Sequence, residues 1–243
     1  MTPERSEVLW GSTRIPYTIQ RSARRETVSV AVEPSGSVVL TAPKGTPIPR
    51  LDRVVRGKAQ WIVERVRRRS DLPPPIEREF ISGEVVLYLG RSYRLRVREH
   101  GKATQTRLEA GHLALTLKRG LGPSERLLEA RRAVIGWLRQ HAEERLPERV
   151  SLWANELRVD APEIRLHEQR QRWGSCTSSG KVRLNWRIIQ APMTLVDYVV
   201  AHELVHLMHR NHGPAFWAKL GSVIPDYEDR KERLRLLGPS LVW

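Results

Sequence analysis

The segment His202-Glu203-Leu204-Val205-His206 places two histidines and a glutamate at a spacing that could bind a metal ion. On an α-helix successive residues turn by about 100°, so the two imidazoles would lie about 40° apart, one turn above the other. Such a pair can share one Zn²⁺ and leave Glu203 beside the open position of the metal. This is the minimum arrangement for metal-assisted hydrolysis, in which Glu203 would act as the general base.

A catalytic zinc site usually has a third protein ligand, and two further histidines follow the motif. His209 would lie a further turn along the helix axis and would be badly placed to join the first two. Gly213 and Pro214 indicate that the chain leaves one helix and opens another at this point. A reversal just before them would bring His212 back to the metal, so we favour His212 as the third ligand. We assign His209 to the turn or to the surroundings of the ligands.

One alternative third ligand stays open on the residues alone. A carboxylate from a later helix, such as Glu228 or Glu232, could replace His212 as the third ligand. The spacing of the three histidines also occurs in metzincin proteases, but these need a methionine turn downstream, and all three methionines precede His212. A helix that carries the two histidines by chance is less favoured, because a buried helix rarely keeps His and Glu together without a partner.

The order of motifs around this segment resembles a known family. Arg172-Trp173-Gly174-Ser175-Cys176-Thr177 is followed by Gly180 to Trp186, by Tyr198 to His206 and by His212 to Trp217. This order resembles the YgjP-like metallopeptidases, predicted metal-dependent hydrolases distantly related to SprT-like zinc proteases. The strong motifs cover residues 169 to 220. The resemblance implies Zn²⁺ bound by His202, His206 and His212, Glu203 as catalytic acid/base, and a peptide or protein substrate, although another amide would suit the same site.

The pattern of apolar residues predicts an α+β protein. Residues 121 to 243 would form a zincin-like metallopeptidase domain, in which the metal helix packs on another helix and a small sheet. Residues 1 to 120 would form a mainly β, basic region with one helix. That region starts with a hairpin whose strands contain Val28 to Val32 and Val38 to Leu40, with a turn at Pro34 to Gly36. There follow a helix from Ile48 to Arg69, whose predicted inward side includes Trp61, a connector at Asp71 to Pro75 and four short strands between Val85 and Leu117.

Helical spacing replaces strand alternation from Pro123 onwards. It predicts a long helix that Pro147 interrupts, then strands at Glu163 to His167 and Lys181 to Trp186. The metal helix would start after Pro192 with Thr194 as a cap, and two helices would complete the chain. A substrate backbone could pair with an edge strand at either Arg172 to Thr177 or Arg183 to Asn185.

The chain is strongly basic, with a formal net charge of +15. Residues 1 to 120 hold 23 Lys and Arg against 12 Asp and Glu, and the densest group lies on the predicted helix: Arg50, Arg53, Arg56, Lys58, Arg65, Arg67, Arg68 and Arg69. Such a stripe could bind the phosphate backbone of nucleic acid. The alternative function is therefore a nucleic-acid-associated protein whose metal site is structural or vestigial, although a solvated helix face explains the stripe equally well.

Cysteine usage and hydropathy point to the cytoplasm. Cys176 is the single cysteine, which excludes an internal disulfide and fits a reducing compartment. We interpret it as a small buried side chain rather than as a nucleophile or metal ligand. Met1 to Gln20 lacks the apolar core of a signal peptide, and no stretch approaches the ~18 apolar residues of a membrane span.

Overall fold

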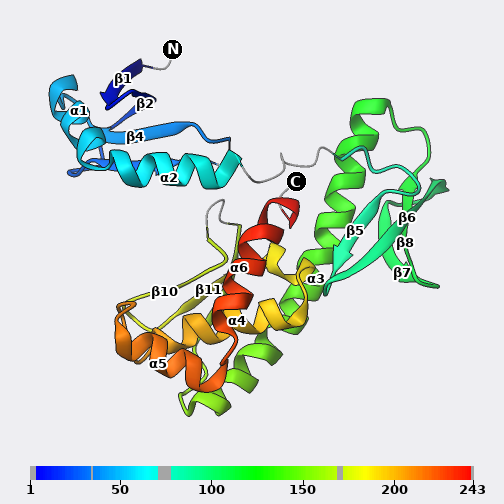
Figure 1. Ribbon diagram of the computed structural model, residues 1–243. Helices are drawn as coiled ribbons and strands as arrows, with labels where there is room; N and C mark the ends of the chain where they lie inside the picture. Colours follow the sequence, from blue (N-terminus) through cyan, green and yellow to red (C-terminus); the bar gives the residue numbers. More distant parts are fainter. Residues whose placement is uncertain (1–3, 34, 71–77, 169–171, 242–243) are drawn as a thin grey trace. The chain divides into compact units, whose positions relative to one another are not determined.

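The computed structural model describes residues 4–33, 35–70, 78–168 and 172–241, apart from the side chains of residues 68–70. The chain forms two compact units, Met1–Pro74 and Pro75–Trp243 (Figure 1). The units therefore divide about 45 residues earlier than the predicted boundary between residues 120 and 121. Each unit is described by itself below. The predicted connector at Asp71 to Pro75 lies outside the described residues.

The first unit contains one four-stranded sheet with the order β1-β2-β4-β3. Its strands are β1 (Glu4–Trp10), β2 (Thr13–Ser22), β3 (Ser29–Val32) and β4 (Val38–Pro43). The predicted hairpin is confirmed, because β3 and β4 pair antiparallel with Val32 opposite Val38. Pro34, in its predicted turn, lies outside the described residues. Strands β2 and β4 pair in parallel. The alternation of apolar and polar residues identifies strands but does not predict which of them pair.

Two helices cover this sheet where the sequence predicts one. They are α1 (Ile48–Gly57) and α2 (Ala59–Ser70), and Lys58 between them leaves the helical backbone at φ −113° and ψ 11°. The break lets Leu51 and Val55 of α1 and Ile62 of α2 all enter one apolar cluster with the sheet. Trp61 was expected to face inward, but its side chain is 44% exposed.

The second unit begins with another four-stranded sheet, of order β5-β6-β8-β7. These strands are β5 (Val85–Tyr88), β6 (Arg91–Gly101), β7 (Gln105–Glu109) and β8 (His112–Lys118). Their buried face, which includes Val86, Leu95 and Leu115, belongs to the same apolar core as the metal helix. This shared core is the physical reason that the second unit starts near residue 75 rather than at residue 121.

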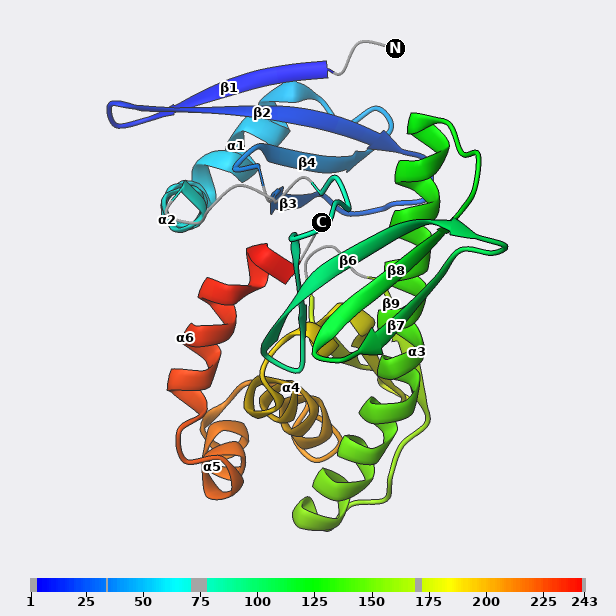
Figure 2. The ribbon, with the colours of Figure 1, turned by 90° about the vertical axis from the view of Figure 1, so that its right-hand side faces the viewer.

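A single helix, α3 (Pro123–Leu157), runs for 35 residues beside this sheet (Figure 2). The predicted interruption at Pro147 is wrong. A proline inside a helix removes one backbone hydrogen bond, but here Leu146 and Val150 beside it are both completely buried. Burial of the apolar face on either side holds the helix continuous, so the packing outweighs the lost hydrogen bond.

The remaining elements surround the helix that carries the metal motif. A three-stranded sheet has the order β10-β11-β9, formed by β9 (Ile164–His167), β10 (Gly174–Cys176) and β11 (Val182–Asn185). A 3₁₀ turn η1 (Trp186–Gln190) leads to α4 (Met193–Val205), and α5 (Pro214–Val223), α6 (Tyr227–Leu237) and η2 (Gly238–Leu241) follow. Helix α4 contacts α3, α5, α6 and β10, which is the expected zincin-like α+β arrangement.

Two local features of α4 matter for its stability. The predicted cap at Thr194 is wrong, because the N-cap position is Pro192 and no side chain caps the helix. A paired arginine and aspartate link α4 to α3: Arg149 donates two hydrogen bonds to Asp197, at 2.7 and 2.9 Å. Within the described residues, no helix combines the length and the apolar character that crossing a membrane requires.

Candidate metal centre

Helix α4 is buried almost all round, and His202 is its most accessible residue between Leu195 and Val205. From Leu195 to Val205 every residue except His202 is buried. A helix with apolar residues on all sides packs inside a protein rather than on its surface. The backbone that carries His202 and Glu203 is therefore fixed by the core. His206 caps the C-terminal end of the same helix with φ −65° and ψ −16°.

The chain leaves the helix at His206, before the reversal that the sequence predicts at residues 209 to 211, and His212 returns to the helix as predicted. The backbone N–H groups of Met208 and His209 both donate to Val205. Helix α5 then begins at Pro214, with Gly213 in the N-cap position. The indole Nε1 of Trp217 donates to the backbone carbonyl of His212 at 3.0 Å. This bond ties the position of His212 to the first turn of α5.

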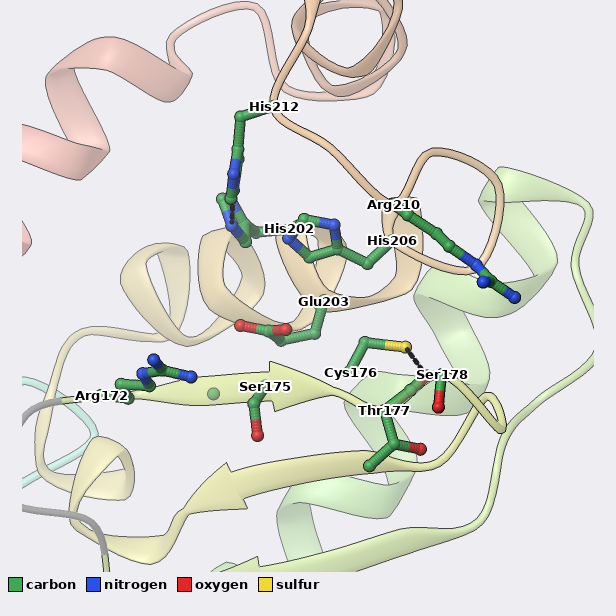
Figure 3. A pocket seen from close by; sticks show the side chains of 11 residues that line it. Arg172, Ser175, Cys176, Thr177, Ser178, His202, Glu203, His206, Arg210 and His212 are labelled. Carbon is green, nitrogen blue, oxygen red and sulfur yellow. Dashed lines mark hydrogen bonds between the residues drawn. The ribbon is translucent and has the colours of Figure 1, made fainter. Parts of the chain in front are cut away.

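The three predicted histidines come together in space (Figure 3). One ring nitrogen from each of His202, His206 and His212 lies within 4.8 Å of the others. The ring centroids are 4.6 to 5.1 Å apart, and the Nε2 atoms of His202 and His212 are 3.0 Å apart. Phe216 packs against all three rings at 4.6 to 4.9 Å and so restricts their rotation.

Hydrogen bonding favours one nitrogen of His206 as a ligand. Its Nδ1 lies 3.0 Å from the backbone carbonyl oxygen of His209, to which it can donate, and this leaves Nε2 free to accept a metal. His209 thus contributes its backbone to the surroundings of the ligands, and its side chain is outside the three-histidine group. Nδ1 of His202 is buried and has no hydrogen-bond partner among the described residues.

Burial favours the neutral form of His202 and His212, which is the form that binds a metal. The pKa of His202 is lowered to about 3, mainly by burial and with smaller contributions from His206, His212 and Lys231. Burial also lowers the pKa of His212, with smaller contributions from His206 and Lys231. Two imidazole nitrogens on one tetrahedral zinc would be about 3.3 Å apart. The 3.0 Å between His202 and His212 is close to that separation.

Glu203 lies beside this group, between α4 and strand β10. Glu203 is only 6% exposed to solvent. Burial raises the pKa of its carboxyl group to about 7, against the opposing effects of the Arg172 charge and of a hydrogen bond from the backbone of Cys176. Gly174 of β10 leaves the space that the carboxyl group occupies, because a Cβ there would lie 2.7 Å from Oε1 of Glu203.

Strand β10 forms one wall of a cavity of about 480 Å³ that also contains the histidines and Glu203. It is an edge strand of its sheet, whereas β11 lies between β10 and β9 and has both edges paired. Of the two segments expected to offer a free edge, Arg172 to Thr177 therefore qualifies and Arg183 to Asn185 does not. Cys176 is half-buried and lines this cavity, so it is more accessible than the sequence predicts.

The structure also separates the proposed alternatives for the third ligand. Among the described residues, the group that could hold a metal consists of His202, His206 and His212, and no carboxylate joins it. Glu232 instead accepts two hydrogen bonds from Arg235. Sequence reasoning missed Gly174 and the close packing of Phe216 against the ligands. The sequence could have indicated Gly174, because a glycine inside a strand often marks a place where another group approaches the backbone closely.

The structure thus combines a buried helix, convergent imidazoles, a buried carboxyl group and a free strand edge. This arrangement is that of a metal-dependent peptidase. The chain belongs to the YgjP-like family, because the model of the YgjP-like metallopeptidase domain matches residues 26–236. A divalent metal and a peptide or protein substrate follow from that membership. A comparison with curated proteins gave no match.

Solved structures similar to this chain include two archaeal metallopeptidase zymogens. Abylysin of Pyrococcus abyssi is 18% identical, with a TM-score of 0.35 over 37% of this chain and 90% of the abylysin chain. Jannalysin of Methanocaldococcus jannaschii is 20% identical, with a TM-score of 0.34 over 37% of this chain and 86% of the jannalysin chain.

Proposed function

We propose that this peptidase uses zinc, that His202, His206 and His212 bind it, and that Glu203 is the general base. The observation that carries the proposal is the convergence of three imidazole nitrogens within 4.8 Å beside a buried carboxylate in one cavity. Neutral imidazole is a good ligand for zinc, and three histidines leave one position of a tetrahedral ion open. The hydrogen bond between His206 and His209 supports the same assignment.

When bound, the zinc ion would supply Lewis-acid activation of a water molecule and of the scissile carbonyl group. Glu203 takes the proton of the attacking water and later gives it to the leaving amine, so one carboxyl group serves as base and then as acid. Its burial between α4 and Gly174 fixes the carboxyl group at the metal-facing end of the cavity. The free edge of β10 offers backbone N–H and C=O groups for pairing with an extended substrate.

Replacement of Glu203 by glutamine tests the mechanism most directly. The variant keeps the size and hydrogen-bonding ability of the side chain but cannot accept a proton. It should bind about one zinc per chain and lose hydrolysis of a mixed peptide library by about 10²-fold or more. Glu228→Gln, an exposed glutamate on α6, is the matched control and should keep full activity. Undiminished hydrolysis by Glu203→Gln would exclude Glu203 as the base.

A second candidate function rests on the first unit, which could bind nucleic acid. Residues 48–70 hold eight Lys or Arg against two Asp or Glu. Arg50, Arg53 and Arg56 are exposed, and the exposed indole of Trp61 on α2 could stack on a base. In its strict form this alternative gives the metal site only a structural or vestigial role. The two functions are also compatible, because the basic helices lie outside the unit that carries the histidines.

Mobility shifts with a labelled oligonucleotide over a salt series test the second candidate. Phosphate contacts predict affinity that falls steeply as salt rises, and Arg53→Gln with Arg56→Gln should reduce the slope by about two. A response that is flat in salt argues against phosphate contacts. Metal analysis together with digestion of the peptide library separates a vestigial site from a working peptidase, because a vestigial site would leave every peptide intact.

A further inference from the structure

A second cavity, of about 310 Å³, adjoins the metal-binding group on the side of α6. It shares Arg172, Gly174, His202 and Glu203 with the larger cavity. Its remaining wall is partly apolar and partly cationic: Trp173, Tyr198, Val199, Lys231, Leu234 and Arg235. Because both cavities meet at the same four residues, a peptide bound across the site would place a neighbouring group in this second cavity.

Lys231 is held near the histidines by aromatic packing. Its Nζ lies 5.0 Å from the centroid of the Trp217 ring, at a distance suited to a cation–π interaction. The Trp217 ring stacks on Tyr227 with centroids 5.3 Å apart and an interplanar angle of 18°. The same indole donates to the carbonyl of His212. One aromatic side chain therefore positions both a histidine of the metal group and a cation beside it.

The positive charges in this cavity are only partly neutralised. Arg235 forms two hydrogen bonds with Glu232, at 2.7 and 2.8 Å, so its charge is already paired. Across the described part of the chain, neither Lys231 nor Arg172 forms an ion pair with a carboxylate. Figure 3 shows Arg172 and Arg210 on opposite sides of Glu203 and the histidines. Among the described residues Lys231 thus lies in this cavity without a carboxylate partner, whereas Arg172 lies near Glu203 and lowers the pKa of that carboxyl group. An apolar wall stands behind both cations.

We propose that Lys231 and Arg172 bind a carboxylate of the peptide substrate in this cavity, so that the enzyme prefers acidic peptides. The inference rests on the proposed function of the adjoining site. Trp173, Val199 and Leu234 provide an apolar surface for the aliphatic part of such a residue, and the two cations face its charged end. The carboxylate comes either from a Glu or Asp side chain or from the C-terminus of the peptide.

Binding measurements on the zinc-loaded, full-length Glu203→Gln protein test this proposal without requiring catalysis. The probes are fluorescein-labelled mixed decapeptide pools with Glu or Gln fixed at two positions, each with a free or an amidated C-terminus. A pool that carries the recognised carboxylate should bind about three- to tenfold more tightly than its neutral counterpart. The preference should shrink as salt rises from about 0.05 to about 0.5 M. Comparison of the four pools identifies the source of the carboxylate.

Single variants connect the preference to the named residues. Lys231→Met and Arg172→Met should each reduce the preference for the acidic pool and leave the affinity for the neutral pool nearly unchanged. Lys219→Met on α5 is the matched control, because Lys219 lines neither cavity. Zinc content and the far-ultraviolet spectrum of each variant show that the site and the fold are intact.

Three results would overturn the proposal. They are equal binding of all four pools, the absence of measurable binding to any pool, and an equal loss of preference in Lys219→Met and Lys231→Met. These results differ from a failure of the proposed function. The wild-type protein could hydrolyse no peptide and still bind the acidic pool more tightly in a way that depends on Lys231. That result would support the carboxylate-binding cavity and contradict the proposed catalytic function.

Discussion

Gly174 is expected to be essential because it leaves room for the carboxyl group of Glu203, the proposed general base. A Cβ built at Gly174 lies 2.6 Å from Cγ, 2.7 Å from Oε1 and 2.9 Å from Cδ of Glu203. Ordinary van der Waals contact begins near 3.4 Å, so Gly174→Ala is too close by 0.7 to 0.8 Å at the two nearest atoms. Glu203 is 6% exposed and has little room to retreat. Its carboxyl group must therefore shift relative to the metal.

A misplacement of about 1 Å at a reacting group can cost about 10²-fold in rate. We therefore expect Gly174→Ala to lower kcat for peptide hydrolysis by about 10- to 100-fold. Zinc content should stay near one ion per chain, because the three atoms nearest the added Cβ all belong to Glu203 and none to a histidine. The crowding should also destabilise the protein by about 1–3 kcal/mol, which is typical of overpacking. Metal analysis, steady-state kinetics and urea denaturation measure these three quantities separately.

Gly136→Ala is the matched control for this substitution. Gly136 lies inside α3, and a Cβ there meets nothing within 4 Å. Alanine should leave activity unchanged and stabilise the helix by about 0.5–1 kcal/mol. If Gly174→Ala acts through Glu203, adding it to Glu203→Gln should cost little further activity. Full kcat in Gly174→Ala, or a loss that follows zinc content, would refute the steric argument.

Three further predictions concern the ligands and the frame that holds them. His212→Ala should weaken zinc binding far more than His209→Ala in a competition titration, and the opposite order would overturn the choice of third ligand. Arg149→Met leaves the buried Asp197 without its partner and should cost about 3 kcal/mol in urea denaturation. Burial alone would raise the pKa of Glu168, but its arginine partners lower it below the usual 4.5. Ionised Glu168 should therefore add its full contribution to the free energy of unfolding above pH 4.5, and this contribution should be lost as the pH falls through the lower folded-state pKa. In Glu168→Gln the free energy of unfolding should consequently change less with pH in the acid range.

Local sequence signals were sufficient to predict that the three histidines and Glu203 come together in space. His202, Glu203 and His206 follow one another at helical spacing, and Gly213 with Pro214 marks the reversal that returns His212. All of these residues lie within thirteen positions, from 202 to 214, so short-range backbone geometry governs their arrangement. The same holds for the hairpin of β3 and β4, in which strands and turn are adjacent in the chain.

Predictions that depended on distant partners were less accurate. Pro147 should interrupt a helix by its local chemistry, yet α3 continues because the core buries the residues on both sides. Trp61 was expected inside by its hydrophobicity, but the break at Lys58 leaves it exposed. The sheet of β5 to β8 belongs to the same unit as the candidate metal centre because its apolar face packs in the core around α3 and α4. None of these partners can be read from neighbouring residues.

The sequence by itself predicted which side chains come together at the candidate metal centre, since spacing within one helix and one turn sets their geometry. The tertiary structure decided what surrounds them. It placed Gly174 against Glu203, made β10 rather than β11 the free edge, and brought Lys231 of α6 beside the histidines. These contacts join segments about 30 residues apart. They depend on how helices and strands pack, and a helical or strand period carries no information about the partner that covers its apolar face.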